Sequence, residues 1–91
     1  MSTAQLALPI APRVLTPVRA LRLALVFDNK ALAGVYLAKH HEFHKNREGV
    51  LMQVRVRETA HGWMLVAWYS GRRYVLTRDN VLRPVRAGEL G

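Results

Sequence analysis

Three histidines lie close together in the middle of the chain, and imidazole can bind a metal ion or titrate near neutral pH. They are His40, His41 and His44. On a helix, His40 and His44 would share one face, a spacing at which two imidazoles can hold one metal ion. Only His61 or Glu48 is available to complete a four-ligand zinc site. We therefore predict no metal or other cofactor, and interpret the cluster as a solvated polar face.

Arginines offer a second kind of chemistry, because a guanidinium neutralises phosphate groups. Arg55 and Arg57 alternate with apolar residues, so on a strand they project together from the outer face. Arg72 and Arg73 follow Ser70-Gly71, a pair typical of a two-residue turn, which would present them at one end of a sheet. Charges also protect the edges of strands, but few acidic residues balance these arginines. An unbalanced basic patch favours contact with a polyanion.

Aromatic residues are interleaved with these arginines. Such rings on a basic sheet can stack on unpaired bases, although they can equally fill the core of a small domain. Strand alternation separates Trp68 from Trp63 and Tyr69, so only one of the two sets can face a ligand. We predict a nucleic-acid-binding set of five arginines and one tryptophan: Arg55, Arg57, Arg72, Arg73, Arg78 and Trp68.

The overall charge agrees with this interpretation. Fourteen Lys and Arg residues oppose six Asp and Glu residues, for a net charge of +8, and the excess is spread along the chain. A domain this basic attracts polyanions, of which nucleic acid is the commonest, although the charge could also serve solubility or an acidic protein partner. The sequence shows no nucleophilic triad, phosphate-binding glycine loop or carboxylate pair, so we do not expect an enzyme.

Composition also bears on location. The chain has no cysteine, which suits a reducing cytoplasm. Its longest apolar stretch, around positions 20–27, is too short to span a membrane, and arginines interrupt it. The first twelve residues carry no positive charge and two prolines, unlike a signal peptide. We expect a cytoplasmic protein without membrane contact.

The 91 residues predict one domain, at positions 16–86, between a flexible arm (1–15) and a short tail (87–91). Thr16 is a typical helix cap and Pro17 a typical first helical residue, which predicts a helix over 17–27, although alternating apolar residues from Leu21 to Phe27 also fit a strand. Asp28 or Asn29 can cap a second helix, Lys30–Glu48, with Gly49 at its end. The alternative makes Gly34–Ala38 a strand.

The second half of the chain predicts an antiparallel meander. Its strands are 50–57, 63–69 and 73–77, with a short fourth at 81–85 that Pro84 confines to an edge. The strand at 63–69 is apolar on both faces and must be central. The predicted fold class is α+β, with one or two N-terminal helices packed on a three- to four-stranded antiparallel meander. An SH3-like small barrel is one form that such a sheet can take.

Positions 62–85 contain a tryptophan-bearing strand, a tight turn, a second strand and the closing run Asp79-Asn80-Val81-Leu82-Arg83-Pro84-Val85. This stretch resembles the end of an SH3-like small barrel, as in integrase C-terminal domains and Tudor-like modules. The resemblance implies a module that binds nucleic acid or another protein. A winged helix, with 30–48 entering a groove, and a RelE-like toxin, with helices before a basic meander, are competing resemblances.

Three functions follow from these observations. The first is a small basic nucleic-acid-binding module, a non-enzymatic accessory or regulatory factor that contacts phosphates of DNA or RNA through a basic sheet face. The second is a protein-binding adapter or inhibitor that docks on an acidic partner surface. The third is a small RelE-like ribonuclease toxin that uses histidine and arginine. The sequence leaves open whether the protein forms a homodimer.

Overall fold

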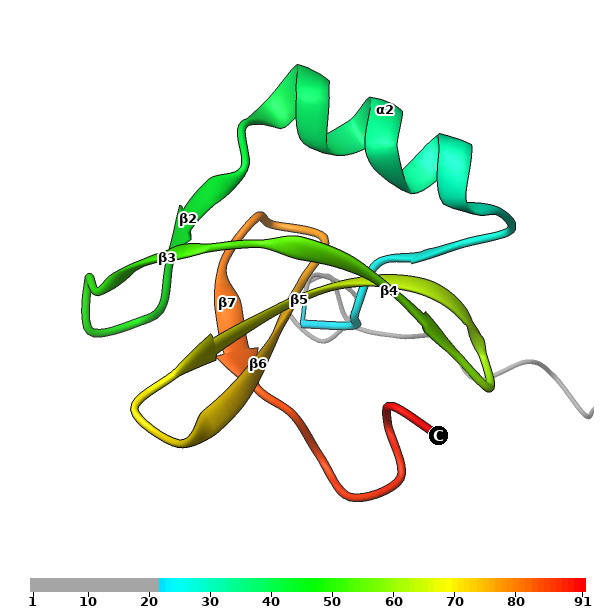
Figure 1. Ribbon diagram of the computed structural model, residues 1–91. Helices are drawn as coiled ribbons and strands as arrows, with labels where there is room; N and C mark the ends of the chain where they lie inside the picture. Colours follow the sequence, from blue (N-terminus) through cyan, green and yellow to red (C-terminus); the bar gives the residue numbers. More distant parts are fainter. Residues whose placement is uncertain (1–21) are drawn as a thin grey trace, which may run out of the picture.

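The computed structural model describes residues 22–91 (Figure 1). This part of the chain is a small α+β domain, in which one short helix accompanies a curled antiparallel half-barrel sheet and a separate two-stranded hairpin. The predicted arm at 1–15, the capping residue Thr16 and positions 17–21 of the first predicted helix lie outside the described residues. No helix within 22–91 is long and apolar enough to cross a membrane.

At positions 22–27 the helix prediction is wrong, and the competing strand interpretation holds. Ala24 forms a bridge with Thr77, and β1 (Val26–Phe27) pairs with the long strand of the sheet. Leu25 and Phe27 pack against the core, as alternation predicts for a strand. Pairing with distant strands therefore outweighs the local preference for helix.

The helix α2 (Lys30–His40) begins where the sequence predicts, because the Asn29 side chain accepts a hydrogen bond from the Leu32 N–H at 2.9 Å. Its predicted extension to Glu48 is wrong, and so is the alternative strand at 34–38. The helix ends at His40, and His41 adopts a positive φ of 82°.

A hairpin replaces the second half of that predicted helix. It joins β2 (Phe43–Lys45) to β3 (Leu51–Gln53). Gly49 has a positive φ of 84° in the connecting turn, so the conformation expected at a helix end serves a hairpin instead. Asn46 holds this turn, because its side-chain oxygen accepts from the Val50 N–H at 2.8 Å. Cross-strand pairing satisfies the backbone groups that a longer helix would have used.

The predicted strand at 50–57 is divided at Val54 into β3 and β4 (Arg55–Thr59). The Val54 N–H donates to the Glu42 carbonyl at 2.7 Å and so stays tied to the segment before β2. Alternation continues through the break: Met52 and Val54 are buried, whereas Gln53 and Arg55 are exposed. The predicted inward and outward faces of this segment are confirmed.

The central position of β5 (Gly62–Tyr69) is also confirmed. Val66 pairs with residues in both β4 and β6 (Arg72–Leu76), so these strands border β5 on opposite sides. Met64 pairs with both β4 and β1, so β1 lies on the same side of β5 as β6. It pairs with the beginning of β5, whereas β6 pairs with the end of β5. The last strand, β7 (Leu82–Pro84), pairs in the sheet with β6 alone and forms its edge, as Pro84 predicts.

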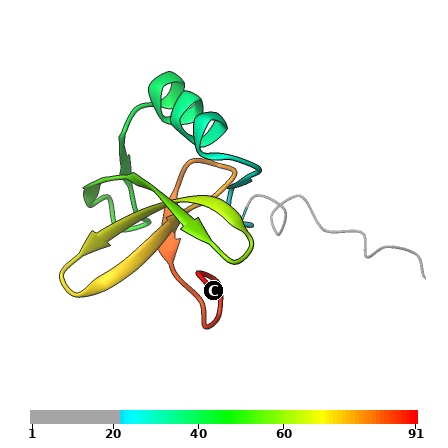
Figure 2. The same cartoon turned by 45° about the vertical axis from the view of Figure 1, so that its right-hand side comes forward.

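The core lies between the sheet and α2, which crosses one side of the sheet (Figure 2). Ala33 of α2 is fully buried there, and Tyr36 and Leu37 pack against the same cluster. The buried core residues of the sheet and hairpin are Met52, Val54, Leu65, Ala67, Tyr74, Leu76 and Leu82. Within residues 22–91, no helix covers the opposite face of β5 and β6.

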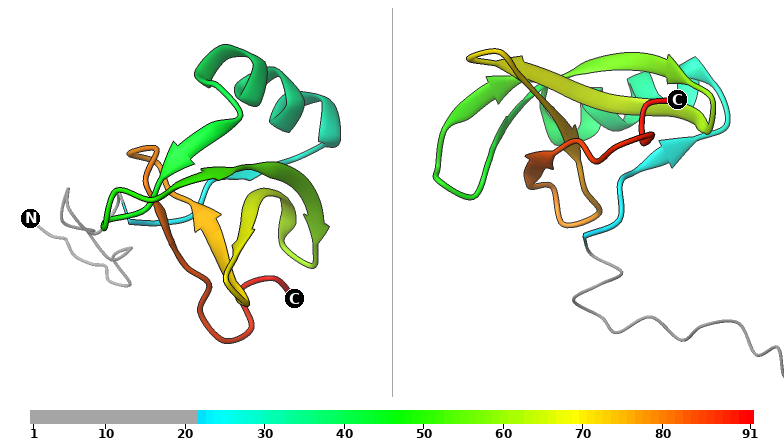
Figure 3. Two further views of the ribbon diagram at one scale, coloured as in Figure 1. Left: turned by 60° about the vertical axis from the view of Figure 1, so that its left-hand side comes forward. Right: turned by 90° about the horizontal axis from the view of Figure 1, so that it is seen from below.

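The C-terminal segment (86–91) runs across that opposite face, from the end of β7 toward the β4–β5 turn (Figure 3). The ring of His61 donates a hydrogen bond to the Gly88 carbonyl at 3.2 Å. Glu89 forms an ion pair with Arg83 of β7. The segment is therefore fastened to the sheet at the adjacent residues Gly88 and Glu89.

Candidate functional site

Four of the six predicted contact residues lie on one face of the sheet. Arg55 is directly opposite Val66, and Trp68 is directly opposite Arg73. Directly opposed residues share a face, as do residues two apart on a strand, so Arg57 joins the same set. We call this set, Arg55, Arg57, Trp68 and Arg73, the arginine face.

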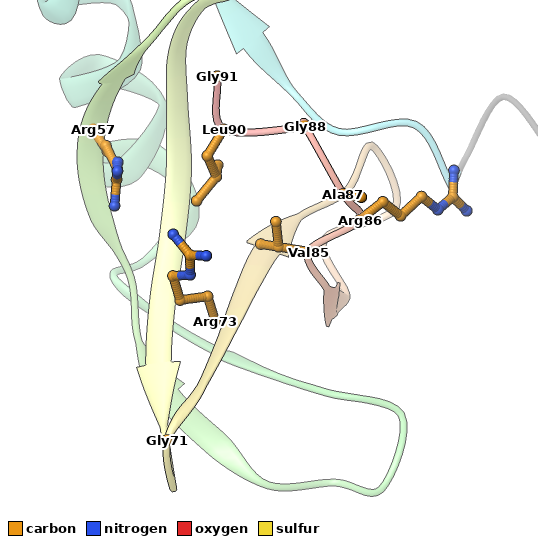
Figure 4. Close-up of a pocket in the computed structure, with 9 residues that line it drawn as sticks. All are labelled: Arg57, Gly71, Arg73, Val85, Arg86, Ala87, Gly88, Leu90 and Gly91. Carbon is orange, nitrogen blue, oxygen red and sulfur yellow. The ribbon is translucent and has the colours of Figure 1, made fainter.

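The arginine face is hollowed by a cavity of about 370 Å³. Its walls come from β3, β4, β5, β6 and the C-terminal segment: Gln53, Arg55, Arg57, Val66, Ala67, Trp68, Arg73 and Leu90. A second cavity of about 480 Å³ shares Arg57, Arg73 and Leu90 and extends to Arg86. In Figure 4, Arg57 lies on the β4 side of β5, Leu90 and Arg73 lie close to each other at the other edge of β5, and Arg86 points away.

The charge on this face is unbalanced. Within residues 22–91, the one ion pair joins Arg83 to Glu89, so the guanidinium groups of the arginine face have no carboxylate within salt-bridge distance. Alternation places Glu58 on the opposite face from Arg57. At the margin of the cavity, Glu42 accepts a hydrogen bond from Gln53 at 3.2 Å. Mutual repulsion among the arginines favours the entry of an anion.

The two remaining predicted residues lie elsewhere. Arg72 is opposite Tyr69, which places it on the other face of the β5–β6 hairpin. Arg78 lies in the turn between β6 and β7, where its backbone N–H donates to the Leu23 carbonyl at 3.1 Å. Neither lines the cavity on the arginine face.

Aromatic residues divide between core and surface. Tyr74 is buried, and Trp63 packs against the core cluster, so both fill the interior. Trp68 keeps 67% of its surface exposed beside the arginines, and Tyr69 on the other face keeps 47%. Trp68 is therefore the large ring that a ligand on the arginine face would meet.

The histidines do not form the arrangement that helical spacing suggested. His40 ends α2 and stacks on Tyr36 at 4.2 Å between ring centroids. His44 is buried in β2, where its Nε2 donates to the His41 carbonyl at 2.9 Å. Across the described positions, no three His, Cys, Asp or Glu side chains gather in a way that could hold a metal ion. The two-ligand argument from helix spacing is wrong.

A larger cavity of about 670 Å³ lies beside β7 and is also basic. Asp79 lines it, however, and its Arg83 is already ion-paired with Glu89. The arginine face is smaller but carries uncompensated charge and an exposed tryptophan. We therefore take it as the candidate site for a polyanion.

Sequence reasoning did not find the contribution of the C-terminal segment. Leu90 lines both cavities and Arg86 lines the second, although the sequence predicts only a short tail there. Glu89, a single acid following two arginines, was the one available signal of a fastened segment. Comparison of the chain with protein-family models, curated proteins and solved structures finds no match.

Proposed function

We propose that the protein is a small, non-enzymatic nucleic-acid-binding module that holds phosphate groups on the arginine face. One observation carries the proposal: Arg55, Arg57 and Arg73 converge on one cavity without an acidic partner in the described chain. Their guanidiniums are exposed, so they can meet a partner without first breaking an internal ion pair.

The curled sheet is consistent with this proposed function. We propose that it is a partly open relative of the SH3-like barrels that positions 62–85 resemble. The support is that β5 pairs with three strands on two sides and that a short proline-bearing strand ends the sheet. Phosphate contacts from correctly placed arginines do not distinguish one base from another, so we expect affinity to depend little on base sequence.

A salt titration tests the proposal. Binding of a fluorescently labelled oligonucleotide of mixed sequence is measured by anisotropy at several NaCl concentrations. Neutralising about three phosphates predicts that log affinity falls against log salt with a slope of about −2 to −3. Reversing Arg55 and Arg57 to glutamate should abolish most of the binding and flatten the slope, because it adds repulsion as well as removing contacts.

The matched control reverses two lysines that lie away from the arginine face. Lys30 on α2 and Lys45 on β2 are exposed, and Lys30→Glu with Lys45→Glu changes the net charge by the same amount. The control should lose much less affinity than the arginine variant. Equal losses would show that net charge alone attracts the oligonucleotide. Failure of the wild type to bind at low salt would end the proposal and favour an acidic protein partner.

A further inference from the structure

The tip of the β5–β6 hairpin holds Trp68 in an unusual setting for so large a side chain. The two-residue turn has positive φ at both positions, 52° at Ser70 and 76° at Gly71, which suits the twist of paired strands. Because the turn is tight and Trp68 is paired directly with Arg73, the ring is carried on a defined strand and not on a long loop. It is nevertheless two-thirds exposed.

The surroundings of the ring are those of a base-binding site. Trp68, Arg55 and Arg73 line the same cavity, together with Gln53, whose amide nitrogen donates to Glu42. An indole offers a flat face on which any base can stack, while guanidiniums on either side neutralise the adjoining phosphates. Arg55 and Arg57 leave β4 about 7 Å apart, as residues two positions apart on a strand do.

We propose that the arginine face recognises single-stranded nucleic acid, with an unpaired base stacked on Trp68 and the neighbouring phosphates held by Arg55, Arg57 and Arg73. This inference rests on the proposed function and adds the class of ligand. Bases inside a duplex are paired and stacked on each other, so their faces are closed to a tryptophan. A duplex can offer the arginines its phosphates, but it leaves Trp68 unused.

The test compares a single-stranded DNA of about 12 nucleotides, within the usual footprint of one small domain, with the duplex of the same sequence. We expect tighter binding of the single strand at equal salt. Trp68→Ala should weaken single-strand binding by about 5- to 150-fold, the range for loss of one stacked base. Its effect on duplex binding and on the salt slope should be small, because the arginines remain.

Trp68→Phe separates stacking from folding, since a phenyl ring retains a stacking face and should restore most of the affinity. It also provides a spectroscopic control. Trp63 is the other tryptophan and packs against the core, so quenching of intrinsic fluorescence by the single strand should disappear in Trp68→Phe although binding persists. Tyr69→Ala removes an exposed ring from the opposite face and should leave affinity nearly unchanged.

The possible outcomes distinguish the two proposals. Equal binding of single strand and duplex, with Trp68→Ala neutral and the Arg55/Arg57 reversal harmful, overturns the single-strand inference and leaves the proposed function standing. Loss of binding in Tyr69→Ala but not in Trp68→Ala also overturns the inference, because it moves the ring contact to the other face. Absence of binding to both probes at low salt overturns both proposals.

Discussion

Arg83 and Glu89 form a two-pronged ion pair that fastens the C-terminal segment to the sheet edge. The Arg83 NH1 donates to one carboxylate oxygen at 2.9 Å, and NH2 donates to the other. The Arg86 backbone N–H donates to the same carboxylate at 2.9 Å. Both charged side chains are largely buried, with 11% and 17% of their surfaces exposed. The pair holds in place the segment that brings Leu90 to the arginine face.

The ion pair between Arg83 and Glu89 makes part of the unfolding free energy depend on pH. Hydrogen bonding from Arg83, opposed by partial burial, holds the pKa of Glu89 below its ordinary value. A lowered folded-state pKa gives stability that is present above the unfolded pKa and lost as pH falls through the folded one. Glu89→Gln should therefore cost about 1 kcal/mol of unfolding free energy at pH 7 and less at pH 3, where the carboxyl is closer to being protonated. Urea unfolding of both proteins at the two pH values measures this, and an equal difference at both would contradict it.

Leu90 allows a second test of where anions bind. It lines the cavity with Arg57 and Arg73, and its side chain lies beside that of Arg73 (Figure 4), so Leu90→Glu would place a carboxylate close to these guanidiniums. We expect oligonucleotide affinity to fall several-fold, with a smaller salt slope, because the new charge competes with phosphate. Val35→Glu is the control, since Val35 is 64% exposed on α2, on the other side of the sheet, and does not line the cavity. Similar losses in both variants would argue against a local effect.

Much of the meander could be predicted because local patterns and tertiary pairing agree there. Alternation at Met52, Val54 and Arg55 gives the correct faces, and the apolar run in β5 gives the central strand. Ser70-Gly71 gives the correct turn. At such positions a change of register would bury charge, so the sequence admits few alternatives.

The prediction fails where pairing with distant residues decides the structure. Positions 43–45 fit a helix face, but they pair with β3, and Asn46 also bridges Leu82 of β7. The arrangement of the candidate site was also predicted correctly in one part and wrongly in another. Alternation correctly unites Arg55 with Arg57, whereas Arg72 and Arg73 separate because neighbours on a strand face opposite sides. The approach of Leu90 depends on the path of the C-terminal segment, which no local pattern reveals.

A long-range hydrogen bond fixes α2 to the turn after β6. The Tyr36 hydroxyl donates to the Asn80 side-chain oxygen, 44 residues away in sequence. Tyr36→Phe keeps the ring but leaves the partly buried acceptor unpaired, so it should cost about 1 kcal/mol of unfolding free energy. Tyr69→Phe, at an exposed ring, should change stability by less than about 0.5 kcal/mol. Urea unfolding compares the two, and a neutral Tyr36→Phe would show that the bond contributes nothing.

Substitution of glycine by alanine should have opposite effects on stability at positions 34 and 71. In both places, an added Cβ would meet no atom within 4 Å, so packing contributes nothing to the difference. Gly34 lies inside α2, where alanine restricts the unfolded chain and favours helix, so Gly34→Ala should stabilise the protein by about 1 kcal/mol. Gly71 has a φ of 76° in the hairpin turn, a conformation that costs alanine about 1–2 kcal/mol.

Gly71→Ala should therefore lower the melting temperature by about 4–8 °C or more, while Gly34→Ala raises it by a similar amount. Thermal unfolding followed by circular dichroism measures both shifts. The hairpin variant should also weaken single-strand binding, because a distorted turn displaces Trp68 from Arg73, whereas the helix variant should bind as the wild type does. Stabilisation by Gly71→Ala would show that the turn does not adopt this backbone conformation, and the defined placement of Trp68 would lose its basis.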